Sequence, residues 1–321
     1  MGFTFDDVNA AKGKATPLAE MERLIAADPR NAEVIKPYLG GEEVNNSPQH
    51  VHHRYVINLS ALSETEARNR YPALISIVEK RVRPDREALP PTNAWNRDVA
   101  SRWWQFAADR KGIAAAARAS EHLLVHSCGA TPHIAFARVQ SAASFANTLA
   151  VFDLSTYAAL AILQSRVHET WARFFASSMK DDLRYTPSDC FETFPLPPGY
   201  ADDPVLEAAG RAYHDHRAGL MVARGQGMTP TYNRFHSKAD EADDVAELRR
   251  LHGDMDRAVL RAYGWGDLAD RAALAFLDEA SEDDHKYQGR LFWPAAFRDE
   301  LLARLLRLNE ERAATERRVG G

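Results

Sequence analysis

The side chains best suited to bind an anionic partner lie in a short polar turn, residues 180–186. Lys180 and Arg184 could contact the phosphates or the base edges of a nucleic acid, and Tyr185 belongs to the same turn. A purely structural interpretation is equally open, because Asp181 or Asp182 could pair with Arg184. The turn therefore indicates either a binding surface or a local ion pair.

Two further segments mix cations, amides and aromatic rings. The run 101–107 could stack on or clamp a nucleic acid, although adjacent tryptophans in a predicted strand are more typical of a core. The run 231–236 is predicted to be a loop between helices, which could contact a phosphate backbone or simply pack as a connector. The candidate contact residues in these segments are Arg102, Trp104, Asn233 and Arg234.

A turn-rich loop, residues 127–133, lies between two predicted strands at 122–126 and 134–139. The loop contains Ser127, Thr131 and His133 but few long polar side chains.

Motifs for catalysis are missing from the sequence. Methyl transfer to a base amino group needs a glycine-rich cofactor loop after a strand and an Asn/Asp-Pro-Pro-aromatic motif, and residues 90–93 have similar letters in the wrong order. For a metal-dependent nuclease, Asp85 and the run 284–286 are too far apart in sequence to be a recognisable motif. We expect no catalytic residue in this chain.

Residues 50–53 hold three histidines, which are common metal ligands. Adjacent histidines on a strand point to opposite faces, and no cluster of carboxylates or cysteines accompanies them. The sequence therefore predicts no metal site.

The bulk composition indicates a folded protein of 321 residues, with 45% apolar residues. No apolar run is long enough to span a bilayer, and the N-terminus does not resemble a signal peptide. Two cysteines, Cys128 and Cys190, suggest a reducing compartment. We expect a cytoplasmic protein without a membrane partner.

The net charge of −5 conceals an uneven distribution. Residues 51–150 hold 13 Lys and Arg against 8 Asp and Glu, whereas the residues from 201 onward hold 18 against 23. Ordinary surface variation would explain this equally well. The basic middle adds Lys111 to the candidate DNA-binding residues.

The hydrophobic pattern predicts an α+β fold. Strands are expected at 53–59, 101–107, 122–126, 134–139 and 148–152, and they form a small, mainly antiparallel sheet flanked by helices. A helix from 63 to about 82 should end ahead of Pro84, and an amphipathic helical stretch should begin at Ser155. After the proline-rich run at 191–200, helices are expected at about 204–223, 239–263 and 294–317.

Four longer segments resemble the C-terminal half of single-chain type IIG/IIL (MmeI-like) restriction-modification DNA adenine methyltransferases. The segments are Gly2–Asp7, Asn31–Glu43, Gln164–Phe175 and Lys180–Pro195. In that family the corresponding region carries a target-recognition domain and a helical tail, and the methylase domain lies upstream. The resemblance implies a linker over 1–50, a target-recognition domain over 51–200 and a helical domain over 201–321.

The resemblance also implies a function. The chain would read double-stranded DNA for N6-adenine methylation in a restriction-modification or phage-defence system. The loop 127–133 would be the base reader, with Ser127, Thr131 and His133 as its contact residues, although its few long polar side chains weaken that assignment. S-adenosylmethionine would bind an absent methylase part, supplied for example by a separate polypeptide, so no cofactor is expected in this chain. Two alternatives remain open at this point: a helical protein-interaction subunit, and a nonfunctional fragment of such an enzyme.

Overall fold

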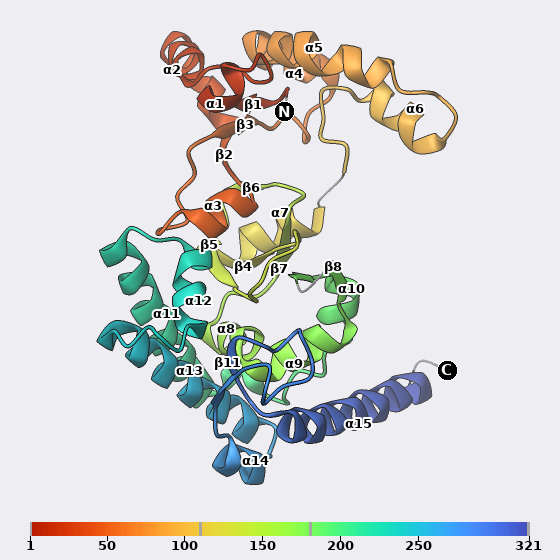
Figure 1. Ribbon diagram of the computed structural model, residues 1–321. Helices are drawn as coiled ribbons and strands as arrows, with labels where there is room; N and C mark the ends of the chain where they lie inside the picture. Colours follow the sequence, from red (N-terminus) through yellow and green to blue (C-terminus); the bar gives the residue numbers. More distant parts are fainter. Residues whose placement is uncertain (1, 109–110, 180–181, 320–321) are drawn as a thin grey trace. The chain divides into compact units, whose positions relative to one another are not determined.

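The computed structural model describes residues 2–108, 111–179 and 182–319. The chain divides into two compact units, each assembled from three stretches of sequence (Figure 1). Unit 1 comprises Met1–Leu39, His52–Glu121 and Gln140–Ala146, and unit 2 comprises Gly40–Val51, His122–Val139 and Asn147–Gly321. The boundaries at 50 and 200 drawn from the resemblance concern functional segments and stay a prediction.

Unit 1 is built around a four-stranded sheet with the order β1-β3-β2-β6. Val56 in β3 is paired with Thr4 in β1 on one side and with Lys36 in β2 on the other, both antiparallel, while β2 and β6 run parallel. Helices cover this sheet, and Tyr71, Leu74 and Trp103 are among the buried residues of the shared core. The elements are β1 (Thr4–Phe5), α1 (Asp7–Ala10), α2 (Leu18–Ala27), the 3-10 helix Pro29–Glu33, β2 (Ile35–Leu39), β3 (Tyr55–Ile57), α4 (Glu64–Arg70), α5 (Pro72–Glu87), α6 (Ala94–Ser101), α7 (Lys111–Ala119) and β6 (Ser144–Phe145).

The helix predicted over 63–82 is divided in two at Tyr71 and runs further than expected. Ser63 caps α4, because its hydroxyl accepts the Glu66 amide and the Glu66 carboxylate accepts the Ser63 amide. The helix α5 begins at Pro72 and passes Pro84, losing one backbone hydrogen bond there. Arg83 pairs with carboxylates one turn before and one turn after it, at 2.8 and 2.7 Å, and so holds this last turn together.

The strand predicted over 101–107 is wrong, because this segment is the end of α6 followed by turns. The carbonyls that a strand partner would bind are taken by arginines instead. Arg86 donates to three carbonyls, including that of Trp103, while Arg102 donates to those of Phe106 and Ala107. The Trp103 ring packs in the core, which is the structural alternative that the sequence left open.

Unit 2 contains a three-stranded sheet with the order β5-β4-β7 and two separate hairpins, β8-β9 and β10-β11. The central pair β4 and β7 is antiparallel, with Leu124 opposite Phe152. Within the predicted strand 134–139, only the end belongs to β5. The bounds are β4 (His122–Ser127), β5 (Ala137–Gln140), β7 (Leu149–Phe152), β8 (Ser177–Met179), β9 (Asp182–Arg184), β10 (Ala275–Leu277) and β11 (Arg290–Phe292).

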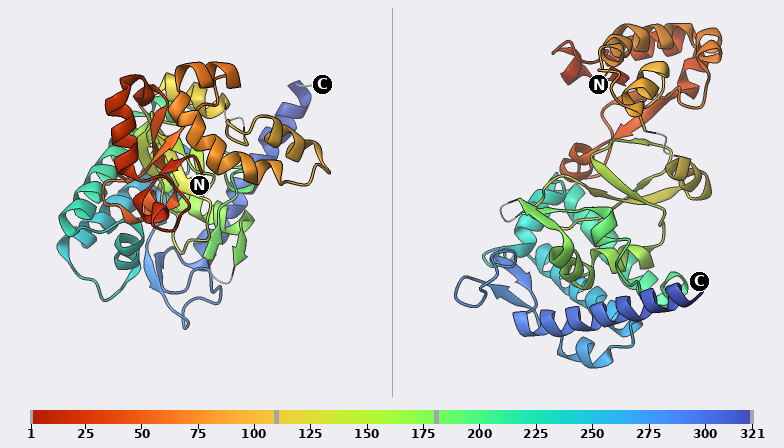
Figure 2. Two further views of the ribbon diagram at one scale, coloured as in Figure 1. Left: turned by 90° about the horizontal axis from the view of Figure 1, so that it is seen from above. Right: turned by 90° about the vertical axis from the view of Figure 1, so that its right-hand side faces the viewer.

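Helices form most of unit 2, and the two views of Figure 2 show the long α15 running along it. The stretch expected to begin at Ser155 is two helices, α8 and α9, separated by Ser165, whose hydroxyl accepts the His168 amide. Every residue of α8 after Tyr157 is buried. The helices are α3 (Gly41–Asn46), α8 (Tyr157–Gln164), α9 (Arg166–Phe175), α10 (Pro187–Cys190), the 3-10 helix Tyr200–Asp202, α11 (Pro204–Arg224), α12 (Met228–His236), α13 (Asp243–Ala262), α14 (Gly266–Arg271) and α15 (Ala295–Val319).

The loop predicted over 231–236 is wrong, because it lies inside α12. Gly227 precedes this helix and comes so close to α3 that an added Cβ would lie 2.3 Å from the Asn45 carbonyl oxygen. The tight approach of α3 and α12 is a tertiary contact, which local polarity does not report. With helices covering small, mainly antiparallel sheets and a helical C-terminal region, the α+β prediction is confirmed.

The close packing of α8 against α11 generates a stability prediction. A Cβ at Gly210 in α11 would lie 2.0 Å from the Tyr157 carbonyl oxygen, whereas Gly219 in the same helix faces open space. Gly210→Ala should therefore lower the free energy of unfolding by about 1–3 kcal/mol. The matched change Gly219→Ala should raise it by up to about 1 kcal/mol, because alanine favours helix. Urea unfolding measures both, and equal effects would contradict the packing explanation.

Candidate nucleic-acid interface

The candidate reader loop 127–133 is joined to the hairpin β8-β9 by backbone hydrogen bonds. Thr131 and Leu183 exchange both amide-to-carbonyl bonds, each 3.1 Å long. Leu183 is buried, and its neighbour Arg184 is exposed. The loop and the Arg184 backbone are therefore held close together, as a contact surface formed by both segments requires.

Inside the loop, His133 connects to α12. Its Nε2 atom lies 2.7 Å from Oδ1 of Asn233, and its ring stacks on the His236 ring with centroids 5.1 Å apart and an angle of 15° between the planes. The Thr131 hydroxyl donates to the His133 carbonyl at 2.6 Å. Three of the predicted contact residues, Thr131, His133 and Asn233, are thus linked in one chain of hydrogen bonds.

Two guanidinium groups donate hydrogen bonds to the backbone in the middle of the loop. Arg173 on α9 and Arg290 on β11 both donate to the Pro132 carbonyl. Arg173 is also paired with Glu169 at 2.7 Å, and both side chains are buried. Because charge-assisted hydrogen bonds are stronger than neutral ones, this arrangement limits the movement of the loop.

The charge state of His133 decides what Asn233 presents to solvent. Burial, and secondarily the Arg290 guanidinium, lower the pKa of His133 to about 4. The ring is therefore neutral at pH 7, and Arg290 lies 3.4 Å from its Nδ1, which fits a proton on Nε2. Nε2 then donates to Asn233 Oδ1, so the exposed amide keeps its Nδ2 group as a free hydrogen-bond donor.

Arg184 is an exposed cation next to the loop 127–133. Its side chain forms no ion pair with any residue in the described part of the chain. The structural alternative, pairing with Asp181 or Asp182, concerns side chains outside the described residues, as does Lys180 itself. The Lys111 side chain also lies outside them, although its backbone begins α7.

The remaining predicted residues have structural environments. Tyr185 is 1% exposed and its hydroxyl lies 3.0 Å from His168 Nε2, while burial raises the pKa of the phenol well above its usual value. Direct DNA contact by Tyr185 is therefore not supported. Ser127 is also buried, at the end of β4. Arg234 pairs with Asp240 at 2.6 Å, which uses the charge that a phosphate would need.

Arg102 and Trp104 belong to unit 1 and serve its fold. Arg102 pairs with Asp98 at 2.6 Å, and the Trp104 indole donates to the Leu62 carbonyl at 2.9 Å. These contacts favour the structural interpretation of the 101–107 segment over the binding one.

Sequence reasoning missed the residues that position the loop, namely Arg173, His236 and Arg290. His236 was part of the supposed loop 231–236, but Arg290 lies 158 residues from the carbonyl it binds. No local pattern marks such a pairing. Arg173 stands between Trp171-Ala172 and Phe174-Phe175 in the sequence, and an arginine inside such an apolar run is a signal that could have been noticed.

A family model described as the MmeI target recognition domain matches residues 12–198. The chain belongs to this family. The resemblance noted in the sequence is thereby confirmed, and the match spans more than half of the 321 residues.

Two relatives extend the comparison. DNA methyltransferase A of Bacillus subtilis (strain 168) is 43% identical over 119 residues, which cover 35% of this chain and 12% of that protein. A solved structure of the type IIL restriction-modification enzyme MmeI in complex with DNA matches 98% of this chain and 34% of its own, with a TM-score of 0.61 and 17% identity. The latter shows a shared fold. This chain therefore spans about a third of the solved enzyme.

No group of three or more His, Cys, Asp and Glu side chains in residues 2–108, 111–179 and 182–319 could hold a metal ion. Within the same ranges, no helix is long and apolar enough to cross a bilayer.

The buried histidines of unit 2 generate a prediction about pH. Burial lowers the pKa of His126 to about 4, well below the usual 6.5, so the folded chain binds this proton less readily than the unfolded chain. The free energy of unfolding should therefore be unaffected by this proton above about pH 6.5. It should fall as the pH drops from 6.5 toward 4, because the unfolded chain then binds the proton and the folded chain does not.

The variant His126→Phe isolates this contribution, because a phenyl ring can keep the contacts with Phe136 and Tyr185. Between pH 7 and pH 5 the variant should lose less unfolding free energy than the wild type, by up to about 2 kcal/mol. Urea unfolding at both pH values gives the two losses. Equal losses would show that His126 does not titrate differently in the folded chain.

Proposed function

We propose that this chain is the DNA target-recognition part of an N6-adenine methyltransferase in a restriction-modification system. It would read duplex DNA, while a methylase part outside this sequence binds S-adenosylmethionine and transfers the methyl group. The proposal is supported by membership of the MmeI target recognition domain family and by the two relatives, one a DNA methyltransferase and the other bound to DNA. A type IIG organisation, a role in phage defence and a cytoplasmic location are parts of the same proposal.

The observation that carries the proposal is the fixed loop 127–133 with Asn233 and Arg184 at its sides. Asn233 offers an Nδ2 donor, and the major groove presents acceptors for it at guanine N7 and O6, adenine N7 and thymine O4. Arg184 can pair with a phosphate or with the two acceptors of guanine. Because hydrogen bonds from Arg173 and Arg290 already hold the loop, little conformational entropy would be lost when it binds.

Substitution of Asn233 tests the base contact. In Asn233→Asp the oxygen that accepts from His133 is kept, but the Nδ2 donor is replaced by a carboxylate oxygen. The preferred duplex should bind about 10- to 100-fold more weakly relative to a scrambled one. The control Thr315→Asp adds the same charge on α15 and should leave this ratio unchanged. Fluorescence anisotropy with a duplex selected from a random pool measures the ratio, and an unaltered preference in Asn233→Asp would exclude Asn233 as a reader.

Arg184 is tested separately, because its charge also affects binding that ignores sequence. If Arg184 contacts a phosphate, Arg184→Ala should reduce the slope of log K against log salt concentration by about 1. If it reads guanine, the variant should instead show a weaker sequence preference. Arg307→Ala removes an exposed arginine from α15 and is the matched control. Equal behaviour of the two variants would remove Arg184 from the interface.

Methylation of a mixed DNA pool with labelled S-adenosylmethionine tests the whole function. The chain is assayed alone and after mixing with the methylase part of a family member. Label incorporation only in the mixture supports a specificity part, and incorporation by the chain alone contradicts the proposed division of labour. No incorporation in either case, together with no salt-sensitive DNA binding, would contradict DNA recognition and favour a protein-interaction role or a nonfunctional fragment.

A further inference from the structure

Unit 1 contains a basic cavity, and none of its lining residues belongs to the loop 127–133 or its supports. The cavity has a volume of about 540 Å³ and three of its lining side chains are cationic against one carboxylate. Its walls come from the N-terminal strand region, the turn after α1, and α5. The lining residues are Gly2, Gly13, Lys14, Lys80, Arg81 and Asp85.

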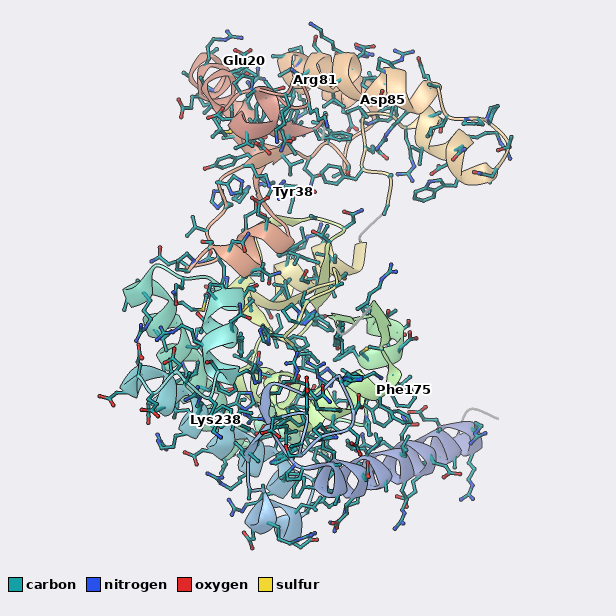
Figure 3. The ribbon with its side chains drawn as sticks, in the orientation of Figure 1. Glu20, Tyr38, Arg81, Asp85, Phe175 and Lys238 are labelled. Carbon is teal, nitrogen blue, oxygen red and sulfur yellow. The ribbon has the colours of Figure 1, made fainter. Side chains whose placement is uncertain are left out.

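A hydrogen bond between two walls shapes this cavity. Arg81 on α5 donates to the Gly13 carbonyl at 3.1 Å, and Figure 3 shows Arg81 and Asp85 along the same helix. Gly13 has a φ of +71°, where other residues are strained. An added Cβ at Gly2 would lie 2.6 Å from Val82 Cγ2. Glycine is thus required at both positions, which leaves backbone rather than side chains on two sides of the cavity.

The two lysines of the cavity differ from Arg83 of α5 in having no acidic partner among the described residues. Arg83, on another part of the same helix, pairs with Glu79 and Glu87, and Glu79 pairs also with Arg68. Neither Lys14 nor Lys80 forms an ion pair with any residue that the structure describes. Their charges are therefore available to an anion from outside.

We propose that this cavity binds a backbone phosphate of duplex DNA, and this inference rests on the proposed function. A phosphodiester carries one negative charge and accepts hydrogen bonds from ammonium and guanidinium groups. The side chains around the cavity are charged groups without an amide or an aromatic ring, so they offer a charge contact rather than a reading of base identity. Unit 1 thereby adds a sequence-independent phosphate contact to the recognition that we assign to unit 2.

The salt dependence of DNA binding tests this site. The cavity variant is the full chain with Lys14→Ala and Lys80→Ala. The control variant carries Lys12→Ala and Lys36→Ala, which remove the same charge from unit 1 outside the cavity. The cavity variant should bind duplex DNA roughly tenfold more weakly, and the slope of log K against log salt should fall by about 1 for each lysine that contacts a phosphate. Its preference between the selected and the scrambled duplex should stay unchanged. Thermal unfolding checks that both variants are folded.

A spectroscopic readout locates the contact independently of affinity. In a protein labelled with ¹⁵N-glycine, the amide signal of Gly13 should shift when duplex DNA is added and should shift much less in the cavity variant. Inorganic phosphate serves as the second probe. A shift with inorganic phosphate but not with duplex would make the cavity a small-anion site and overturn its assignment to DNA.

The possible failures are distinguishable. If the wild type binds DNA with sequence preference and the cavity and control variants lose affinity and slope equally, the phosphate site is wrong and the proposed function stands. If the wild type binds no duplex at any salt concentration and Gly13 does not shift, both are wrong. Loss of the sequence preference in the cavity variant would contradict a contact that ignores sequence.

Discussion

Arg166 and Asp256 form an ion pair in the interior of unit 2, with 2.6 Å between the charged atoms and both side chains almost fully buried. Such a pair is stable only when hydrogen bonds offset the loss of water. The Arg166 amide also donates to Asp256, and the guanidinium donates to the Leu291 carbonyl and contacts His252. Burial alone would raise the pKa of Asp256, but His252 and Arg166 lower it below its usual value, so the carboxylate stays charged.

This ion pair matters because it connects the first residue of α9 with α13 and β11. The strand β11 carries Arg290, and α9 carries Arg173, the two residues that donate to the Pro132 carbonyl. His236 on α12 accepts the Leu291 amide and stacks on His133. The position of the candidate reader loop is therefore set by a buried polar network, and a break at Arg166 would disturb several of these supports together.

The two units use their charges differently. In unit 2 the arginines under the loop bind a buried carboxylate and carbonyls, and the exposed groups beside the loop include Arg184 and the Asn233 amide. In unit 1 the cavity lysines form no ion pair with any described residue, while Arg83 of α5 is paired with two carboxylates. The basic middle of the sequence thus contains both structural arginines, such as Arg86 and Arg102, and cations free to meet a ligand. Net charge does not separate these two classes, because it does not depend on which partners folding provides.

The sequence by itself determined the fold class, the family and most of the long helices, because caps, prolines and hydrophobic spacing are local properties. It also placed β4 and β7 correctly. Only the tertiary structure decided that Trp103 lies in a core, that residues 231–236 are helical and that Tyr185 is buried against His168. Each of these depends on a contact between residues far apart in the chain. The supports of the loop were hidden for the same reason: the pairing of Arg290 with Pro132 is fixed by packing, and no local pattern in the sequence records it.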